Sequence, residues 1–135
     1  MGEEKMNTKS WRQFIVDEMV EILKKVANGE ITPKTIGYTW KEKHAGNVIF
    51  LVGDNIIIVF NDCDSWDYID TWIMSTGCVY DYDWFKESNL PDSLLYKNFG
   101  EETWNKMVDK FSNARRIFEV KEEINNRKKN EDNRK

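Results

Sequence analysis

The 135-residue chain is poor in the residues that form cross-links or carry chemistry, with two cysteines, two prolines and one histidine. Cys63 and Cys78 lack the second pair that a zinc ribbon needs, and we interpret both as small buried side chains in a reducing compartment. His44, beside Ala45 and Gly46, is interpreted as a solvated turn residue rather than a general base. These scarcities argue against a disulfide scaffold, a zinc ribbon and a Cys–His nucleophile pair.

Long apolar runs are also absent, since the longest, Ile56 to Phe60, has only the length of a strand. The first residues have neither a basic start nor an apolar stretch, and the acids after Gly2 do not suit a lipidation signal. No glycine-rich phosphate loop follows a strand, and no serine has a nucleophile-elbow context. We therefore expect a cytoplasmic protein that spans no membrane and binds no cofactor.

What the chain does contain is typical of one compact folded unit. Hydrophobic residues make up 40% of the sequence and aromatic residues 13%, including six tryptophans, which is richer than a disordered chain would be. The length suits one hydrophobic core. We expect a single α+β domain over residues 1–126, followed by a charged flexible tail over residues 127–135.

A helix is predicted from residue 10 to residue 28. Ser10 and Gln13 form a capping-box pattern at its start, and Gly29 after Asn28 supplies a left-handed stop. One face repeats apolar residues at helical spacing and is expected in the core: Trp11, Phe14, Ile15, Met19, Ile22, Leu23 and Val26.

From Thr35 the period of the pattern changes to two, which predicts an antiparallel meander of four or five strands. Turns are expected at residues 44–47, at 53–55 and at 75–77. The expected strands cover residues 35–40, 48–52, 56–60, 68–73 and 78–82. The third of these is apolar on both faces, which indicates a central position that a helix covers on at least one side.

After Pro91 the pattern becomes helical again. A short helical turn is expected over residues 94–96, and a last helix begins near Glu101 and continues to about residue 126. The predicted fold is therefore α+β, with the N-terminal helix and a long C-terminal helix packed on one face of a four- or five-stranded, mainly antiparallel sheet. Whether the last helix packs on its own sheet or on a second copy, giving a homodimer, stays open.

The middle of the chain is acidic. Residues 54–92 contain nine acidic residues and one basic residue, and four of the acids, Asp62, Asp64, Asp67 and Asp70, fall within nine positions. Such a block repels a nucleic-acid backbone and attracts a basic partner. The segment that begins at Asp62 does not match a calcium-binding EF-hand loop. An aspartate stands where the loop requires glycine, and an isoleucine stands where it requires a bidentate glutamate.

Each acid also has a purely structural interpretation. Asp62 and Asp64 can close turns through their own backbone, and Asp67 and Asp70 can point outward from an exposed strand. Aromatic residues alternate with the acids, however, and this combination is typical of interface hot spots. The predicted partner-binding residues are Asp62, Asp64, Trp66, Asp67, Tyr68, Asp70, Asp81, Asp83 and Trp84.

The run from Ile57 to Asp64, with Asn61-Asp62-Cys63 at its centre, the following Asp67-Tyr68 and the segment from Pro91 to Leu95 resemble a small bacterial domain family of unknown function. The resemblance covers about residues 48–112. The chain differs from the pattern of this family at Trp66, where a smaller apolar residue is expected, and in its long charged C-terminal helix. The resemblance implies no activity, but it implies a shared role for Asn61, Asp62, Asp67 and Tyr68.

We expect a non-enzymatic binding protein, such as a small inhibitor or regulator of the phage or bacterial anti-defence or immunity type, that offers its acidic and aromatic surface to a basic protein. The alternative is a metal-dependent hydrolase in which Asp62 and Asp64, with Asp81 or Asp83, hold magnesium or manganese. A third option is an accessory domain whose basic tail contacts RNA or another protein.

Overall fold

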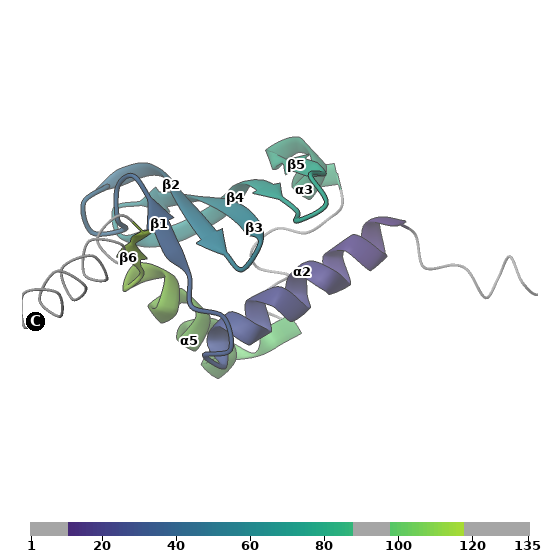
Figure 1. Cartoon of the computed structure of the whole chain (residues 1–135), viewed down its shortest axis with the longest axis horizontal. Helices are drawn as coiled ribbons and strands as arrows, with labels where there is room; N and C mark the ends of the chain where they lie inside the picture. The colour runs from purple at the N-terminus through teal and green to yellow at the C-terminus, as the bar shows by residue number, and fades with distance from the viewer. Residues whose placement is uncertain (1–10, 88–97, 118–135) are drawn as a thin grey trace, which may run out of the picture.

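The computed structural model describes residues 11–87 and 98–117. Figure 1 shows a sheet on one side of the molecule and helices α2 and α5 on the other. The elements in chain order are α2 (Trp11–Ala27), β1 (Lys34–Ile36), β2 (Ala45–Val52), β3 (Asn55–Asp62), β4 (Ser65–Ile73), β5 (Val79–Asp81), α3 (Tyr82–Glu87), α5 (Glu101–Ser112) and β6 (Arg115–Arg116). No helix within these ranges combines the length and the apolar character needed to cross a bilayer.

The six strands form one sheet in the order β5-β4-β3-β2-β1-β6. Strands β1 to β5 pair with one another in chain order and antiparallel, so the predicted meander is confirmed. The sheet as a whole is mixed, because β6 pairs with β1 in parallel. This sixth strand was not predicted. Gly53, with φ of 60°, opens the two-residue turn that brings Val52 opposite Asn55, as the glycine there suggested.

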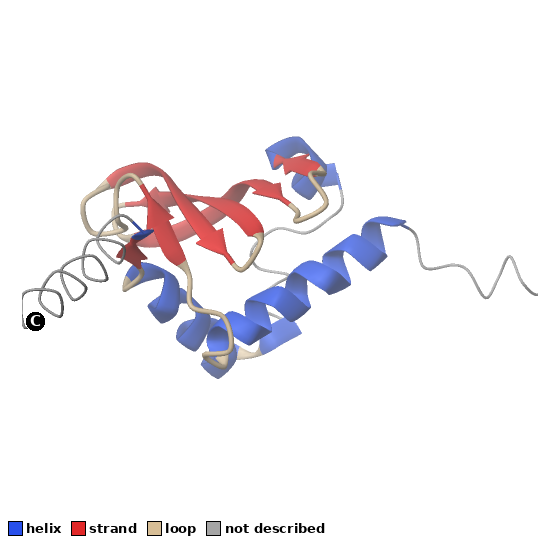
Figure 2. Ribbon diagram, viewed as in Figure 1, coloured by secondary structure: helices blue, strands red, loops and turns tan. Residues whose placement is uncertain are grey.

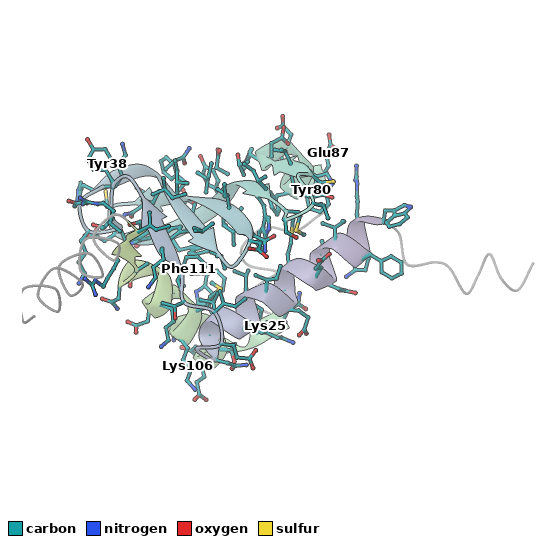
Figure 3. All side chains as sticks on the ribbon, viewed as in Figure 1. Lys25, Tyr38, Tyr80, Glu87, Lys106 and Phe111 are labelled. Carbon is teal, nitrogen blue, oxygen red and sulfur yellow. The ribbon has the colours of Figure 1, made fainter. Side chains whose placement is uncertain are left out.

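Both long helices lie on the same face of the sheet, and the core fills the space between the two layers (Figure 2). Phe111 of α5 occupies this space in Figure 3. Its ring packs edge to face with the Phe50 ring, and the two ring centroids are 4.8 Å apart. The inward residues of β2 and β3 alternate with outward ones, which is the pattern of strands covered on one side. The largest fully buried side chains are Trp72, Phe50, Phe111, Met19, Leu23, Ile57 and Met107.

Helix α2 matches the prediction to within one residue at each end, although Ser10, its expected cap, lies outside the described residues. Its apolar stripe is only partly in the core. Met19, Leu23 and Val26 are fully buried, whereas Trp11 is 84% exposed and Phe14 55% exposed. The prediction that these two aromatics belong to the core was wrong, because they lie at the end of the helix farthest from α5 (Figure 1).

The first strand is shorter than expected and ends at Ile36. Gly37 follows with a φ of 87°, a left-handed conformation that ends the extended run. Trp40 consequently leaves the strand and packs into the core from the following turn, where it is 3% exposed. The expected turn at residues 44–47 is also displaced, because Ala45 already begins β2. His44 is exposed beside it, as predicted.

The C-terminal helix also departs from the prediction, since α5 ends at Ser112 rather than near residue 126. The Asn113 side chain donates hydrogen bonds to the backbone oxygen and to Oδ1 of Asp109, at 2.9 and 3.1 Å. An asparagine that binds its own preceding turn competes with the next helical turn. Buried Ala114 then leads the chain into β6. The expected turn at residues 94–96, the part of the predicted last helix from residue 118 to 126 and the tail at 127–135 lie outside the described residues.

Strand β6 is held at the edge of the sheet by an ion pair. The Arg116 guanidinium binds the Glu42 carboxylate, which also accepts hydrogen bonds from the backbone N–H and the hydroxyl of Thr39. These contacts, chiefly the one from Arg116, lower the pKa of Glu42 from 4.5 to about 2. The turn that follows β1 is thereby tied to the last strand.

The ion pair predicts a pH-dependent loss of stability. Between pH 4.5 and about 2 the unfolded chain binds a proton at residue 42 that the folded chain does not, so stability rises with pH across this window. We expect Glu42→Gln to lower the melting temperature at pH 7, and the gap to the parent chain to close as the pH falls toward 2. Thermal melts from pH 7 to pH 2 measure this, with exposed Glu18→Gln as the control. A gap that stays constant with pH would contradict it.

Candidate functional site

The acidic motif begins at a tight hairpin turn between β3 and β4. Asp62 pairs with Ser65, and the two residues between them, Cys63 and Asp64, have φ values of 50° and 69°. Positive φ at both central residues is the requirement of a type I′ turn, which joins strands without disturbing their twist. Cys63 is exposed here, as Cys78 is in the turn before β5, so the prediction that the cysteines are buried was wrong.

The next two acids are the extra residues of two β-bulges. The pairing of β3 with β4 skips Asp67, between Trp66 and Tyr68, and skips Asp70, between Ile69 and Thr71. A bulge inserts one unpaired residue and bends the strand. Inward-facing residues of β4 therefore recur every three positions, at Trp66, Ile69 and Trp72, instead of every two.

The bulges also decide which aromatic residues lie toward the helices. Trp66 packs against Trp40, Trp104 and Phe111. Its ring and the Phe111 ring meet edge to face, with their centroids 5.2 Å apart. Trp84 of α3 packs against Tyr80 and Phe85, and both Tyr80 and Trp84 border the core. Two predicted partner-binding residues, Trp66 and Trp84, are thus placed against the core.

The opposite face of the sheet, which we call the outer face, has its own aromatic cluster. The rings of Phe60 and Tyr68 are cross-strand neighbours, stacked 5.1 Å apart with planes within 1° of parallel. The Tyr82 ring lies 4.9 Å from Tyr68 at a tilt of 55°, and Tyr82 is 44% exposed. Phe60 was not among the predicted site residues, although its alternation with buried Val59 indicates an outward side chain.

The two bulge residues, Asp67 and Asp70, flank Tyr68 along β4. Desolvation raises the pKa of Tyr68, and the negative charges of Asp70 and Asp67 raise it further because they oppose formation of a second anion. Asp70 also accepts a hydrogen bond from the Thr71 hydroxyl at 2.9 Å. The structure therefore brings Asp67, Tyr68 and Asp70 together with Phe60 and Tyr82. We call these five residues the aromatic-acid cluster.

The other predicted acids have local structural tasks. Asp81 accepts a hydrogen bond from the backbone N–H of Trp84 at 3.0 Å and caps α3, and Asp83 is exposed in the first turn of that helix. Asp62 and Asp64 stay at the β3–β4 turn. Within residues 11–87 and 98–117, no three histidine, cysteine or acidic side chains converge as metal ligands would.

Asn61, which precedes these acids, is fully buried and acts as a clamp. Its side-chain amide donates hydrogen bonds to the backbone oxygens of Trp40 and Lys43, at 3.0 and 2.7 Å. These bonds attach the turn between β1 and β2 to the centre of the sheet. The amide nitrogen of this buried asparagine is paired with the backbone, while its Oδ1 is buried without a hydrogen-bond partner among the described residues. Asn61 thus has a structural task in this fold, and the shared role implied by the resemblance stays a prediction.

The chain is thus an α+β domain with two helices on one face of its sheet and an aromatic-acid cluster on the other. It belongs to the DUF7693 family, described as a domain of unknown function, whose profile matches residues 15–106. The predicted resemblance to a family of unknown function is confirmed to that extent. The matched region contains strands β1 to β5 and ends within α5, before β6. No curated protein and no solved structure shows significant similarity to the chain.

Removal of the Asn61 clamp should destabilise the protein strongly. We expect Asn61→Ala to lower the free energy of unfolding by about 2–4 kcal/mol, because two backbone carbonyls lose their donor in a mostly buried site. Asp62→Ala, an exposed change one position later in the same strand, is the control and should cost little. Urea unfolding of both variants measures the difference. Equal losses in the two variants would show that the amide is not a clamp.

The β3–β4 turn predicts a stabilising change. Cys63 adopts a left-handed conformation that costs an ordinary residue about 1–2 kcal/mol, whereas Asn-Gly suits both turn positions. We expect the double variant Cys63→Asn/Asp64→Gly to gain about 1 kcal/mol and to melt several degrees higher. Cys78→Asn, which removes the other exposed cysteine from a position without positive φ, should give no such gain. Calorimetry compares the three chains.

Proposed function

We propose that this protein is a non-enzymatic binding protein that presents its aromatic-acid cluster to the basic surface of a protein partner. One observation carries the proposal: the stacked rings of Phe60 and Tyr68 and the adjoining ring of Tyr82 lie beside two carboxylates of β4, on the sheet face opposite helices α2 and α5. As an inhibitor or regulator of the anti-defence or immunity type, the protein would act by occupying a basic surface of its target.

The chemistry of the cluster suits arginine in particular. A guanidinium group can lie flat on an aromatic ring while its edge donates two hydrogen bonds to a carboxylate. Tyr82, which is 44% exposed, offers the ring, and Asp67 and Asp70 offer carboxylates on either side of its neighbour Tyr68 along β4. The strand pairing and the two bulges hold these groups in place, so little side-chain entropy is lost on binding.

Charge determines the class of partner. The acidic block that surrounds the cluster repels phosphate backbones, so nucleic acid is disfavoured as a direct ligand. The same charge attracts a protein groove that is itself built to bind nucleic acid, because an acidic surface competes with phosphates for basic side chains. A basic protein is therefore the proposed partner.

Selection of random displayed peptides against the purified chain tests this function. We expect the selected peptides to be rich in arginine and to bind about tenfold more weakly to Asp67→Asn/Asp70→Asn, because asparagine keeps the bulges and removes the charges. The control, Glu101→Gln/Glu102→Gln, removes the same charge from exposed positions of α5 and should bind as the parent chain does. Selected peptides without basic residues, or equal binding to all three proteins, would refute the proposal.

Metal titration tests the competing hydrolase. In the proposed binding protein, magnesium and manganese should produce neither heat on calorimetric titration nor a rise in melting temperature, because the aspartates serve turns, bulges and a helix cap. Saturable heat that disappears in Asp62→Asn/Asp64→Asn would instead favour the metal-dependent enzyme.

A further inference from the structure

The outer face contains an aliphatic surface next to the aromatic-acid cluster. The strand register aligns the outward side chains in rows that cross five strands from β1 to β5. One row consists of Lys34, Leu51, Ile56, Ile73 and Val79, and the next consists of Ile36, Ile49, Ile58, Thr71 and Asp81. We call these two rows the aliphatic rows. Outward faces of exposed sheets are normally polar, so seven aliphatic residues here need an explanation.

The two long helices do not cover the aliphatic rows, whose central residues are half-buried. Helices α2 and α5 both lie on the other side of the sheet, while side chains project from the uncovered side in Figure 3. Ile36 is 38% exposed and Val79 is 61% exposed. A continuous apolar area of this kind on a sheet is typical of a protein interface.

Charge selects the occupant of this surface. Lys34 lies at the β1 end of the rows, and Asp81 lies at the β5 end. A two-fold rotation about an axis parallel to the strands would place the β1 side of one sheet over the β5 side of its copy. Lys34 would then lie over Val79 of the second molecule, one row (about 6.8 Å) from Asp81 and within reach of it through the long lysine side chain. The rotation repeats this contact at the other end of the rows, while the central isoleucines face one another. An isologous dimer requires this kind of self-complementarity.

We propose that the outer face binds a second copy of this chain, sheet against sheet, to form a homodimer resembling a β-sandwich. Aligned sheets pack face to face about 10 Å apart through interdigitating apolar side chains. Pairing through the sheet edges is the less favourable route. The edge strands β5 and β6 have three and two residues, too few for a long intermolecular ladder.

The size of the surface predicts a weak dimer. With strands about 4.8 Å apart and same-face rows about 6.8 Å apart, the two aliphatic rows over five strands and a third row over β2 to β4 (Asn47, Phe60 and Tyr68) span roughly 400–450 Å² per copy. The total of roughly 800–900 Å² is below the 1,200–2,000 Å² of standard stable interfaces. The net charge of -4 on each copy further opposes association. We therefore expect weak association, with a dissociation constant on the order of 10–100 µM.

The homodimer would also regulate partner binding. Phe60 and Tyr68 lie on the same face, in the third row, so a second copy and a basic partner would exclude each other. This competition rests on the function proposed above, whereas the dimer itself does not.

Sedimentation velocity of the full chain from about 5 µM to about 500 µM tests the dimer. We expect the weight-average mass to rise from monomer toward dimer with concentration. Ile58→Lys, which places two lysines near the two-fold axis, should abolish the rise. Ile58→Thr keeps the β-branched shape if lysine prevents folding, and it should weaken association about tenfold. Asn105→Lys adds the same charge at an exposed position of α5 and should associate as the parent does.

A parent chain that remains monomeric over the whole range, or an Ile58→Thr variant that dimerises as the parent does, would overturn the dimer. Neither result affects peptide binding to the aromatic-acid cluster, so failure of the dimer and failure of the proposed function are distinguishable. Loss of association in Asn105→Lys would place the interface on the helical side and would also overturn the proposal.

Discussion

The two extra residues of β4 are the constraint on which the rest of the structure depends. In a regular strand with Trp66 facing inward, Tyr68 and Asp70 would also face the core, and a charged carboxylate would be buried without a partner. The bulges at Asp67 and Asp70 change the period to three, so that Trp66, Ile69 and Trp72 all reach the core. The same two insertions leave Tyr68 and the carboxylates on the outer face. Core packing and surface chemistry thus follow from one local irregularity.

The two faces of the sheet consequently have separate tasks. The inner face joins Phe50, Trp66 and Phe111 into a continuous aromatic layer that holds α5 under the sheet. Asn61 extends this layer to the turn after β1 through its two hydrogen bonds. The outer face contributes little to this core. Its aromatic-acid cluster and aliphatic rows can therefore be changed by substitution with less cost to folding than the inner face.

The regular parts of the fold could be predicted from the sequence, and the irregular parts could not. Helix α2 and the five-strand meander were predicted because their periods of 3.6 and 2 persist over many residues. Strand β6 was missed because two arginines give no strand signal. The end of α5 was missed because it is marked only by Asn113, and an asparagine is a weaker signal of a helix end than glycine or proline. Helix α3 was missed because Tyr82 continues the alternation of the preceding strand.

The candidate site was predicted in position but not in detail. The acids and aromatics of residues 62–81 were correctly located on the sheet, whereas Tyr82, Asp83 and Trp84 belong to α3, and the faces of the aromatics could not be assigned. A bulge shifts every later residue to the other face, and neither bulge has a glycine or other local marker. Trp66 was therefore grouped with Tyr68, from which the fold separates it, and Phe60 was left out of the cluster that it joins.

The parallel pairing of β6 with β1 has a consequence for the order of folding. Every other strand pair joins neighbours along the chain, whereas this pair brings Lys34 beside Arg115 across most of the domain. Closing so large a loop costs chain entropy, and the few contacts of a two-residue strand offset little of that cost. Local hairpins should form first and β6 last. In the folded protein, the amide hydrogens of β6 should exchange with solvent through local opening, whereas those of β3 should exchange only on global unfolding.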